Sequence, residues 1–351
     1  MGTASSVVGG AAPAVVRRVL VPQTLVPRSV PREATLHTLA GTTMGTTWSV
    51  KLIAAREAPL AAIERVIHRE LDRVVSQMST WEPTSDLARF NRAPAGSWHT
   101  IPEAFAEVLA CALDLARDSG GAFDPCAGVV VDAWGFGPHG RWREADFVPP
   151  DAACIDAARA LGGCARLPFD RARWRLQQPG GLRLDLSAIA KGHAVDRVAV
   201  ALQDEFGLDN LLVEVGGELR GQGAKPDGQP WWVQLASPRD DGTAGAWVAL
   251  HGLSVATSGD DQRVFVRNGV RHPHTIDPRS GRPIGHGVCA VSVLHASCMW
   301  ADALSTALTV LGPVAGRAWA EARGIAALWT TRRRDGGFDE TMTSACAALA
   351  D

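Results

Sequence analysis

The residues best suited to hold a metal ion lie on one predicted helix near the C-terminal end of the chain. Asp302 and Thr306 are four residues apart, which places a carboxylate and a hydroxyl on one face of a helix predicted over residues 299–311. Hard oxygen ligands of this kind suit a divalent cation that neutralises phosphoryl oxygens. The alternative reading is a solvated helix start, where Asp302 only complements the helix dipole.

Lys191 and Asp185 flank a second predicted helix start. Lys191 opens a helix predicted over residues 190–206, after a strand predicted over residues 182–186 and a tight turn. A cation and free backbone N–H groups together favour an anion at this place, although an exposed lysine is the ordinary alternative. Asp185 stands between two leucines, so its carboxylate needs a partner if it is buried. Asp196, further along the helix, is interpreted as a surface charge.

His274 is the first candidate for accepting a proton. Its ordinary pKa lies near neutral pH, which suits a general base, and Asp302 is the competing base if a metal does not fully occupy it. His272 and His274 would also face one side of a strand and could bind a metal together. Two histidines around Pro273 are, however, typical of an exposed polar turn.

The elements that must position these residues alternate between strands and long helices. Apolar residues at steps of three and four predict two further helices, over residues 59–78 and 102–117. Period-two patterns and short apolar runs predict strands at residues 44–52, 210–215, 231–235, 247–250, 254–256 and 289–295. Long helices packed on mostly antiparallel strands indicate an α+β layer architecture.

Composition limits the class of protein. The chain has 351 residues, of which 46% are hydrophobic and 21% charged, enough for one large domain or two intimate ones. Its net charge of −2 gives no global positive field for nucleic acid. No uninterrupted apolar run approaches the roughly 18 residues of a membrane span, so none is predicted. Seven scattered cysteines without a Cys-x-x-Cys pair argue against a disulfide framework and a thiolate zinc site.

The two ends of the chain are expected to lie outside the folded domain. Residues 1–36 are rich in Ala, Val, Pro and Gly and are predicted to be a disordered lead. Arginines and prolines interrupt their apolar residues, so no secretory signal is expected and the protein is predicted to be cytoplasmic; a misassigned start would instead allow a periplasmic location. The folded domain is expected over residues 37–330, followed by a C-terminal tail over residues 331–351.

Five ordered segments are unusual for a plain core. They are residues 43–48, 78–91, 120–137, 185–196 and 257–307. Together they resemble the FAD:protein FMN transferases, the ApbE family of flavin transferases, over about residues 40–315. The resemblance implies a T-fold-like α+β fold, a single large domain with two intimate subdomains. It also implies a Mg²⁺-dependent enzyme that takes FAD as substrate, transfers FMN to a Thr or Ser hydroxyl of an acceptor protein, and releases AMP. The acceptor would be an FMN-binding domain of a redox or membrane electron-transfer complex.

The resemblance also implies which residues form the site. It completes the metal site of Asp302 and Thr306 with the backbone carbonyl of Ala188 and with Ser305, and it supports His274 as the base. The residues that it indicates for FAD, with Met44 and Trp81 as apolar walls for a flat ring, are Met44, Trp81, Ala122, Phe123, Asp124, Asp185, Lys191 and Ile276.

Two departures from the family pattern concern residues beside these segments. The family often carries Thr and Tyr where this chain has Cys126 and His193, which alters either flavin contacts or local packing.

Two other functions share the same candidate site. A hydrolase would use water as the nucleophile and cleave FAD into FMN and AMP, and a delivery protein would bind FAD without turnover. Simple retention of a flavin has no need for a magnesium site, which argues against the delivery protein. The sequence contains no P-loop and no Gly-x-Gly-x-x-Gly opening a helix after a strand, so neither standard nucleotide motif is available.

Overall fold

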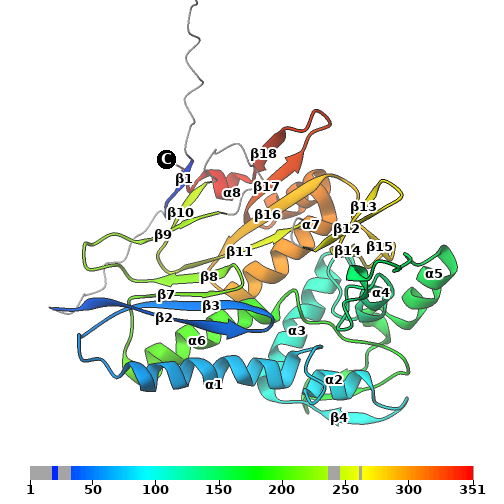
Figure 1. Cartoon of the computed structure of the whole chain (residues 1–351), viewed down its shortest axis with the longest axis horizontal. Helices are drawn as coiled ribbons and strands as arrows, with labels where there is room; N and C mark the ends of the chain where they lie inside the picture. Colours follow the sequence, from blue (N-terminus) through cyan, green and yellow to red (C-terminus); the bar gives the residue numbers. More distant parts are fainter. Residues whose placement is uncertain (1–17, 23–32, 236–245, 261–262, 351) are drawn as a thin grey trace, which may run out of the picture.

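The protein is built around an eight-stranded sheet (Figure 1). The computed structural model describes residues 18–22, 33–235, 246–260 and 263–350. All neighbouring strands of the large sheet are antiparallel. Their order is β18 (Phe338–Met342), β17 (Ala326–Arg332), β16 (Val288–His295), β11 (Leu253–Gly259), β8 (Glu218–Gln222), β7 (Leu211–Val215), β3 (Thr46–Ala54) and β2 (Thr35–Thr43).

Three long helices cover one face of the large sheet. They are α1 (Leu60–Met78), α6 (Ala190–Phe206) and α7 (Cys298–Glu321). Helix α7 packs on β11 and β16, α6 packs on β7 and β8, and α1 packs beside α6. The predicted α+β architecture of long helices on a mostly antiparallel sheet is therefore confirmed.

Each central strand divides its apolar residues between two cores. Leu52 and Val293 belong to the core under the helices, whereas the residues that follow them, Ile53 and Leu294, belong to a second core on the opposite face. Successive side chains of a strand point to opposite faces, so a sheet buried on both faces needs apolar residues in sequence. A small sheet of β1 (Val19–Leu20), β10 (Trp247–Leu250) and β9 (Trp231–Gln234) covers this second face.

Part of the predicted disordered lead is ordered. Strand β1 pairs in parallel with β10, and Leu20 is 1% exposed in the second core. The prediction for residues 1–36 is therefore wrong for residues 18–22 and 33–36, because burial of Leu20 and the pairing of β2 hold these segments; the remainder of the lead lies outside the described residues. At the other end, β18 and α8 (Ser344–Ala347) belong to the same fold, since α8 packs on β17 and buries Cys346.

A smaller region lies beside α7, at the right of Figure 1. It has its own apolar cluster, which includes Trp134, Phe136, Phe265 and Ile276. The remaining elements, here and at the foot of the molecule, are α2 (Asp86–Asn91), β4 (Trp98–Thr100), α3 (Glu103–Asp118), α4 (Gly128–Ala133), η1 (Arg141–Arg143), α5 (Ala152–Leu161), η2 (Cys164–Arg166), β5 (Phe169–Asp170), β6 (Arg175–Gln177), β12 (Val264–Arg267), β13 (Val270–Pro273), β14 (Ile276–Asp277) and β15 (Arg282–Pro283).

One predicted strand is absent. Residues 182–186 form an extended loop, although their leucine side chains are buried as the pattern requires. The Leu184 N–H donates to Asn91 Oδ1 (2.8 Å), and the Asp185 N–H donates to the Pro125 carbonyl (2.8 Å). The extended chain is thus held by a side chain and a loop instead of a partner strand.

Helix α7 is the central helix of the core. Among the described helices, α7 alone is long and apolar enough to cross a membrane by length and composition. Yet 61% of its most apolar window is buried inside the protein, and the helix packs on β11, β16 and α6. Its apolar character is therefore explained by burial in the core.

Candidate active site

The N-terminal parts of α6 and α7 meet at Gly192 and Asp302. The Gly192 N–H donates to Asp302 Oδ2 (3.0 Å), and Asp302 is only 3% exposed. A Cβ atom at position 192 would lie 2.3 Å from the Cys298 carbonyl oxygen, far closer than van der Waals contact. Glycine therefore permits the close approach of the two helices, which brings the carboxylate to the start of α6.

Asp196 fixes the start of α7 from its place on α6. Its carboxylate accepts hydrogen bonds from the Ser297 hydroxyl (2.7 Å) and from the backbone N–H groups of Cys298 (3.1 Å) and Met299 (3.0 Å). It also pairs with Arg220 (2.6 Å). A carboxylate at this position caps the helix and complements its dipole. The interpretation of Asp196 as a surface charge is wrong, because its carboxylate binds the first turn of α7 and Arg220.

Lys191 lies between two acidic groups. Its ammonium forms an ion pair with Glu218, which is 3% exposed. Burial acts to lower the pKa of Lys191, but the negative charges of Asp302 and Glu218 outweigh burial and raise it. The result is a fixed cation beside the Asp302 carboxylate.

The two acidic groups respond to burial in the same way. Burial raises the pKa of Asp302, against the opposing charge of Lys191, and it raises the pKa of Glu218. Glu218 Oε2 is buried and has no hydrogen-bond partner in the described part of the chain. Glu218 was missed from the sequence, where it follows the Gly216–Gly217 turn without any pattern that marks it.

Three hydroxyl groups meet where the end of β11 approaches α7. Ser258 Oγ, at the end of β11, is 2.8 Å from Ser305 Oγ and 2.9 Å from Thr306 Oγ1. Ser305 also donates to the Asp302 carbonyl (2.8 Å). The structure thus brings together the hydroxyls predicted at 305 and 306 and adds Ser258. Ser258 lies in the segment Thr257-Ser258-Gly259-Asp260, which was recognised from sequence, but no role was predicted for it.

The β2–β3 hairpin brings Met44 to this side of the sheet. Met44 and Gly45 have φ of 49° and 72°, as a two-residue hairpin turn with primed geometry requires. Residues 42–47 line an open hollow of about 500 Å³. A Cβ at Gly216 would lie 2.8 Å from Thr46 Cγ2 and 3.4 Å from Lys191 Cδ. The hairpin tip and Lys191 are therefore neighbours.

His274 is half-buried and directly follows β13. Its backbone N–H donates to the Arg263 carbonyl (2.9 Å), and its ring is 6.2 Å from that of Phe136. Burial, followed by the charge of Arg263, lowers the pKa of His274 to about 4. The ring is therefore neutral at neutral pH, and its Nδ1 is buried without a hydrogen-bond partner among the described residues. Ile276, which is 7% exposed, belongs to the same apolar cluster as Phe136.

The loop segments around Asp124 and Asp185 lie against each other through the Asp185–Pro125 backbone bond. Asp185 Oδ1 accepts from the Ser187 N–H (2.8 Å), which shapes the turn before α6. Asp124 Oδ1 accepts from the Cys126 N–H (2.7 Å). Both carboxylates therefore hold backbone turns, and their contacts to FAD stay predictions.

The other predicted site residues occupy different surroundings. Ala122 and Phe123 are buried, and Phe123 is part of the main core, so its side chain serves packing. Ala188 is half-buried in the turn before α6. Trp81 is 53% exposed, and among the described residues no hydrogen bond or ring contact joins it to the other site residues.

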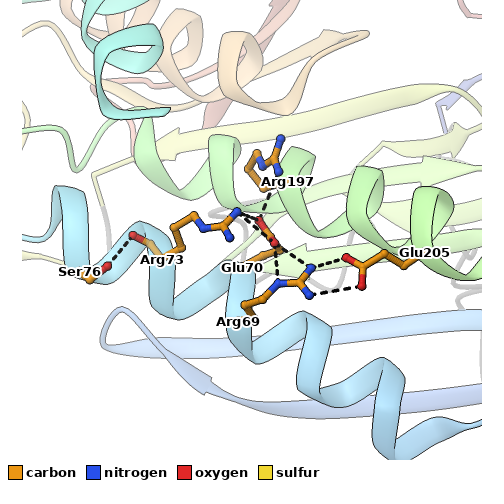
Figure 2. A network of polar contacts seen from close by, with 6 residues as sticks. All are labelled: Arg69, Glu70, Arg73, Ser76, Arg197 and Glu205. Carbon is orange, nitrogen blue, oxygen red and sulfur yellow. Dashed lines mark hydrogen bonds and ion pairs between the residues drawn. The ribbon is translucent and has the colours of Figure 1, made fainter. Parts of the chain in front are cut away.

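A network of charges fastens α1 to α6, the helix that carries Lys191 (Figure 2). Buried Glu70 receives hydrogen bonds from Arg69 (3.0 Å), Arg73 (3.1 Å) and Arg197 (3.4 Å). Arg69 also pairs with Glu205. A buried carboxylate needs such partners, and here they come from both helices.

The two departures from the family pattern lie in buried places. His193 is 6% exposed, and burial, followed by the charge of Arg197, lowers its pKa to about 4. Its Nε2 has no hydrogen-bond partner in the described structure. Cys126 is fully buried, and the neighbouring Cys164 thiol, together with burial, raises the pKa of the Cys126 thiol.

Comparison with known proteins shows the family of this chain. The sequence profile described as the ApbE family matches residues 44–329, which span nearly all the elements above. The chain belongs to the ApbE family. It is 39% identical to the FAD:protein FMN transferase of Vibrio cholerae over 317 residues, which cover 87% of this chain and 90% of that protein. It is 34% identical to the FAD:protein FMN transferase of Haemophilus influenzae over 330 residues, 91% of this chain and 93% of that one.

Solved structures of ApbE proteins have the same fold. The apo flavinyl transferase ApbE of Pseudomonas stutzeri superimposes with a TM-score of 0.82 at 41% identity, covering 90% of this chain and 97% of that one. The flavin transferase ApbE of Vibrio cholerae gives a TM-score of 0.81 at 36% identity, covering 90% and 99% of the two chains. The predicted family, fold and enzyme class are therefore confirmed.

Proposed function

We propose that this ApbE protein transfers the FMN part of FAD to a Thr or Ser hydroxyl of an acceptor flavoprotein and releases AMP, in a Mg²⁺-dependent reaction. The observation that carries the proposal is the meeting of the Asp302 carboxylate and the Lys191 cation at the start of α6. A site that breaks a diphosphate needs both a place for a divalent ion and positive charge for the phosphates.

The donor groups around Asp302 fit Mg²⁺. They are a buried carboxylate with one hydrogen bond from Gly192 to Oδ2, and the hydroxyls of Ser305 and Thr306. The Ala188 carbonyl would complete the set from the turn before α6. All are hard oxygen ligands, which Mg²⁺ prefers. When bound, Mg²⁺ supplies charge neutralisation at the phosphoryl oxygens.

The residues of the chain divide the remaining work. The Lys191 ammonium, at the start of α6, attracts the diphosphate of FAD. The hollow beside Met44 accommodates part of the nucleotide. The acceptor hydroxyl oxygen then forms a bond to the phosphorus on the FMN side, the bond from that phosphorus to the oxygen of AMP breaks, and the hydroxyl proton passes to a base.

His274 is the proposed base. It is neutral at neutral pH, and its buried Nδ1 has no hydrogen-bond partner in the described structure. A pKa of about 4 makes His274 a weak base, so it would accept the proton only as the new bond to phosphorus forms. Asp302, the competing base, is already engaged by Gly192 and by its proposed metal role.

The test combines purified protein, FAD, Mg²⁺ and a flavin-carrier domain with a Thr or Ser acceptor. We expect yellow fluorescence on the carrier that survives denaturing gel electrophoresis and disappears with EDTA. The matched control is the same carrier with its acceptor Thr or Ser replaced by Ala. Labelling that is unchanged by EDTA would refute the metal requirement, and carriers that stay unlabelled would refute transfer.

The same incubation separates transfer from hydrolysis. Without a carrier, a transferase leaves most FAD intact, because the reaction needs the acceptor hydroxyl as its nucleophile. Fast stoichiometric release of AMP under these conditions would instead identify an FAD pyrophosphatase. FAD that binds and is never cleaved, with or without a carrier, would identify a delivery protein.

A further inference from the structure

Three potential metal ligands meet at a second place in the fold, outside the Asp302 site. The side chains of Asp124, Cys126 and Cys164 each offer one ligand atom, and all three atoms lie within 4.8 Å of one another. Cys164 Sγ lies 2.7 Å from Asp124 Oδ1. Cys126 is fully buried, and the other two are half-buried. Among the residues that the structure describes, this is the only group of three potential ligands whose ligand atoms lie this close together.

Two segments far apart in sequence create this cluster. Asp124 and Cys126 lie in the turn between α3 and α4, and Cys164 begins the η2 turn after α5. The segments touch at Gly162, where a Cβ would lie 2.9 Å from the Cys126 carbonyl oxygen. Helices α4 and α5 also pack on each other. The cluster is thus held by the fold and does not depend on one flexible loop.

The donor set selects a class of metal. Two thiolates and a carboxylate suit Zn²⁺, whereas Mg²⁺ prefers oxygen ligands alone. With Zn–S bonds of about 2.3 Å and Zn–O bonds of about 2.1 Å, tetrahedral ligand atoms are roughly 3.5–3.8 Å apart. The three ligand atoms lie within 4.8 Å of one another, and the 2.7 Å separation of Cys164 Sγ and Asp124 Oδ1 would have to widen by roughly 0.9 Å to hold an ion.

A hollow beside the cluster provides access for an ion. It has a volume of about 200 Å³, and Asp124, Gly162 and Gly163 are among the residues that line it. Arg159 lines this hollow as well. A metal site requires an entry path, and water in this hollow can complete a fourth position.

We propose that Asp124, Cys126 and Cys164 bind one Zn²⁺ ion, with water from the adjoining hollow as the fourth ligand. The ion fastens the η2 turn to the turn that carries Asp124. The latter turn is bonded to the Asp185 backbone through Pro125, so the ion stabilises the loops next to α6. This role is separate from phosphate chemistry at Asp302.

A disulfide between the two cysteines is the competing use of this pair. It would need an external oxidant and a reactive thiolate. A carboxylate in contact with a thiol disfavours the thiolate in the absence of a metal, yet the same carboxylate is an additional ligand when a metal is present. The position of Asp124 therefore favours the metal.

The test uses the full-length protein, reduced, stripped of metal with a chelator, and titrated with Co²⁺ in excess Mg²⁺. We expect one equivalent of Co²⁺ with thiolate-to-cobalt charge-transfer absorption, which Zn²⁺ abolishes by displacement. The variants Cys164→Ser and Cys126→Thr should lose this absorption. Their Zn²⁺ dissociation constants should rise by more than the roughly 10–100-fold that loss of an outer-shell contact causes.

Two controls separate this site from others. Cys154→Ser, which changes an exposed cysteine on α5, should keep the absorption, and so should Asp302→Asn, which removes the proposed magnesium ligand. Folding of each variant is checked by circular dichroism. Absence of the sulfur band in the wild type, or its persistence in folded Cys164→Ser, would overturn the proposal. A metal-free protein isolated with a Cys126–Cys164 disulfide, seen as a mass lower by two hydrogens, would also overturn it.

Discussion

Replacement of Gly192 by Ala tests whether the contact between α6 and α7 builds the site. The new Cβ would lie 2.3 Å from the Cys298 carbonyl oxygen and 2.8 Å from Asp302 Cβ, so the helices must separate. Overpacking costs about 1–3 kcal/mol, loss of a charged hydrogen bond about 1.5–3 kcal/mol, and better helix propensity returns about 1 kcal/mol. The net expectation is a loss of about 1.5–5 kcal/mol in the free energy of unfolding.

The assay has two parts, urea denaturation and carrier labelling with FAD. Because displacement of a catalytic group by about 1 Å can cost roughly a hundredfold in rate, labelling by Gly192→Ala should fall by at least about tenfold even where the variant is fully folded. Gly285→Ala is the matched control, since Gly285 is exposed and a Cβ there meets nothing within 4 Å. A Gly192→Ala protein as stable and active as Gly285→Ala would refute the argument.

Three further predictions concern residues around this junction. Asp302→Asn keeps an acceptor for Gly192 but loses the negative charge, so Mg²⁺-dependent labelling should fall by more than about a hundredfold in a folded protein; unchanged labelling at saturating Mg²⁺ would remove Asp302 from the site. Asp196→Ala removes the carboxylate that accepts from the Cys298 and Met299 N–H groups and pairs with Arg220, and we expect unfolding in urea to show a loss of about 3–5 kcal/mol, with near wild-type stability contradicting its role at the start of α7. His193 has a pKa of about 4 in the folded protein against about 6.5 unfolded, so the unfolded chain binds the extra proton between these pH values, and stability falls as pH is lowered from 6.5 to 4 by about 3 kcal/mol for this residue. His193→Gln should remove that part of the pH dependence in denaturation curves, and an identical pH profile would show that His193 does not contribute.

The helices could be predicted well from sequence because their signal is local. The spacing of apolar residues predicted α1, α3 and α6 to within one or two residues, since one buried face repeats every three or four positions. The strand predicted at residues 182–186 failed for the opposite reason. An apolar run shows burial, but a strand also needs a partner, and here Asn91 and Pro125 take that place.

The hairpin at Met44 shows a similar limit. The alternating pattern after residue 44 correctly indicated β3, but the chain reverses at Met44 and Gly45, with β2 before them. Gly45 alone is a weak turn signal, and a methionine with positive φ is uncommon. Only the pairing of Thr43 with Thr46 defines this hairpin.

Part of the site could be predicted from the spacing of residues along the chain. Asp302 and Thr306 share a helix face because of their spacing, and Lys191 stands at a helix start because of the pattern that follows it. Glu218 and Ser258 did not follow, because each lies on a different strand and is recognisable only by what it touches.

What the amino-acid order determined by itself was therefore periodic and local: the helices, their apolar faces, and the motifs that reveal the family. What the tertiary structure alone decided was the choice of partners between distant segments, such as Asp196 with the start of α7, or Cys126 with Cys164. The physical reason is that local patterns specify which face of an element is buried, whereas the neighbour that buries it depends on how the sheet and its connections close.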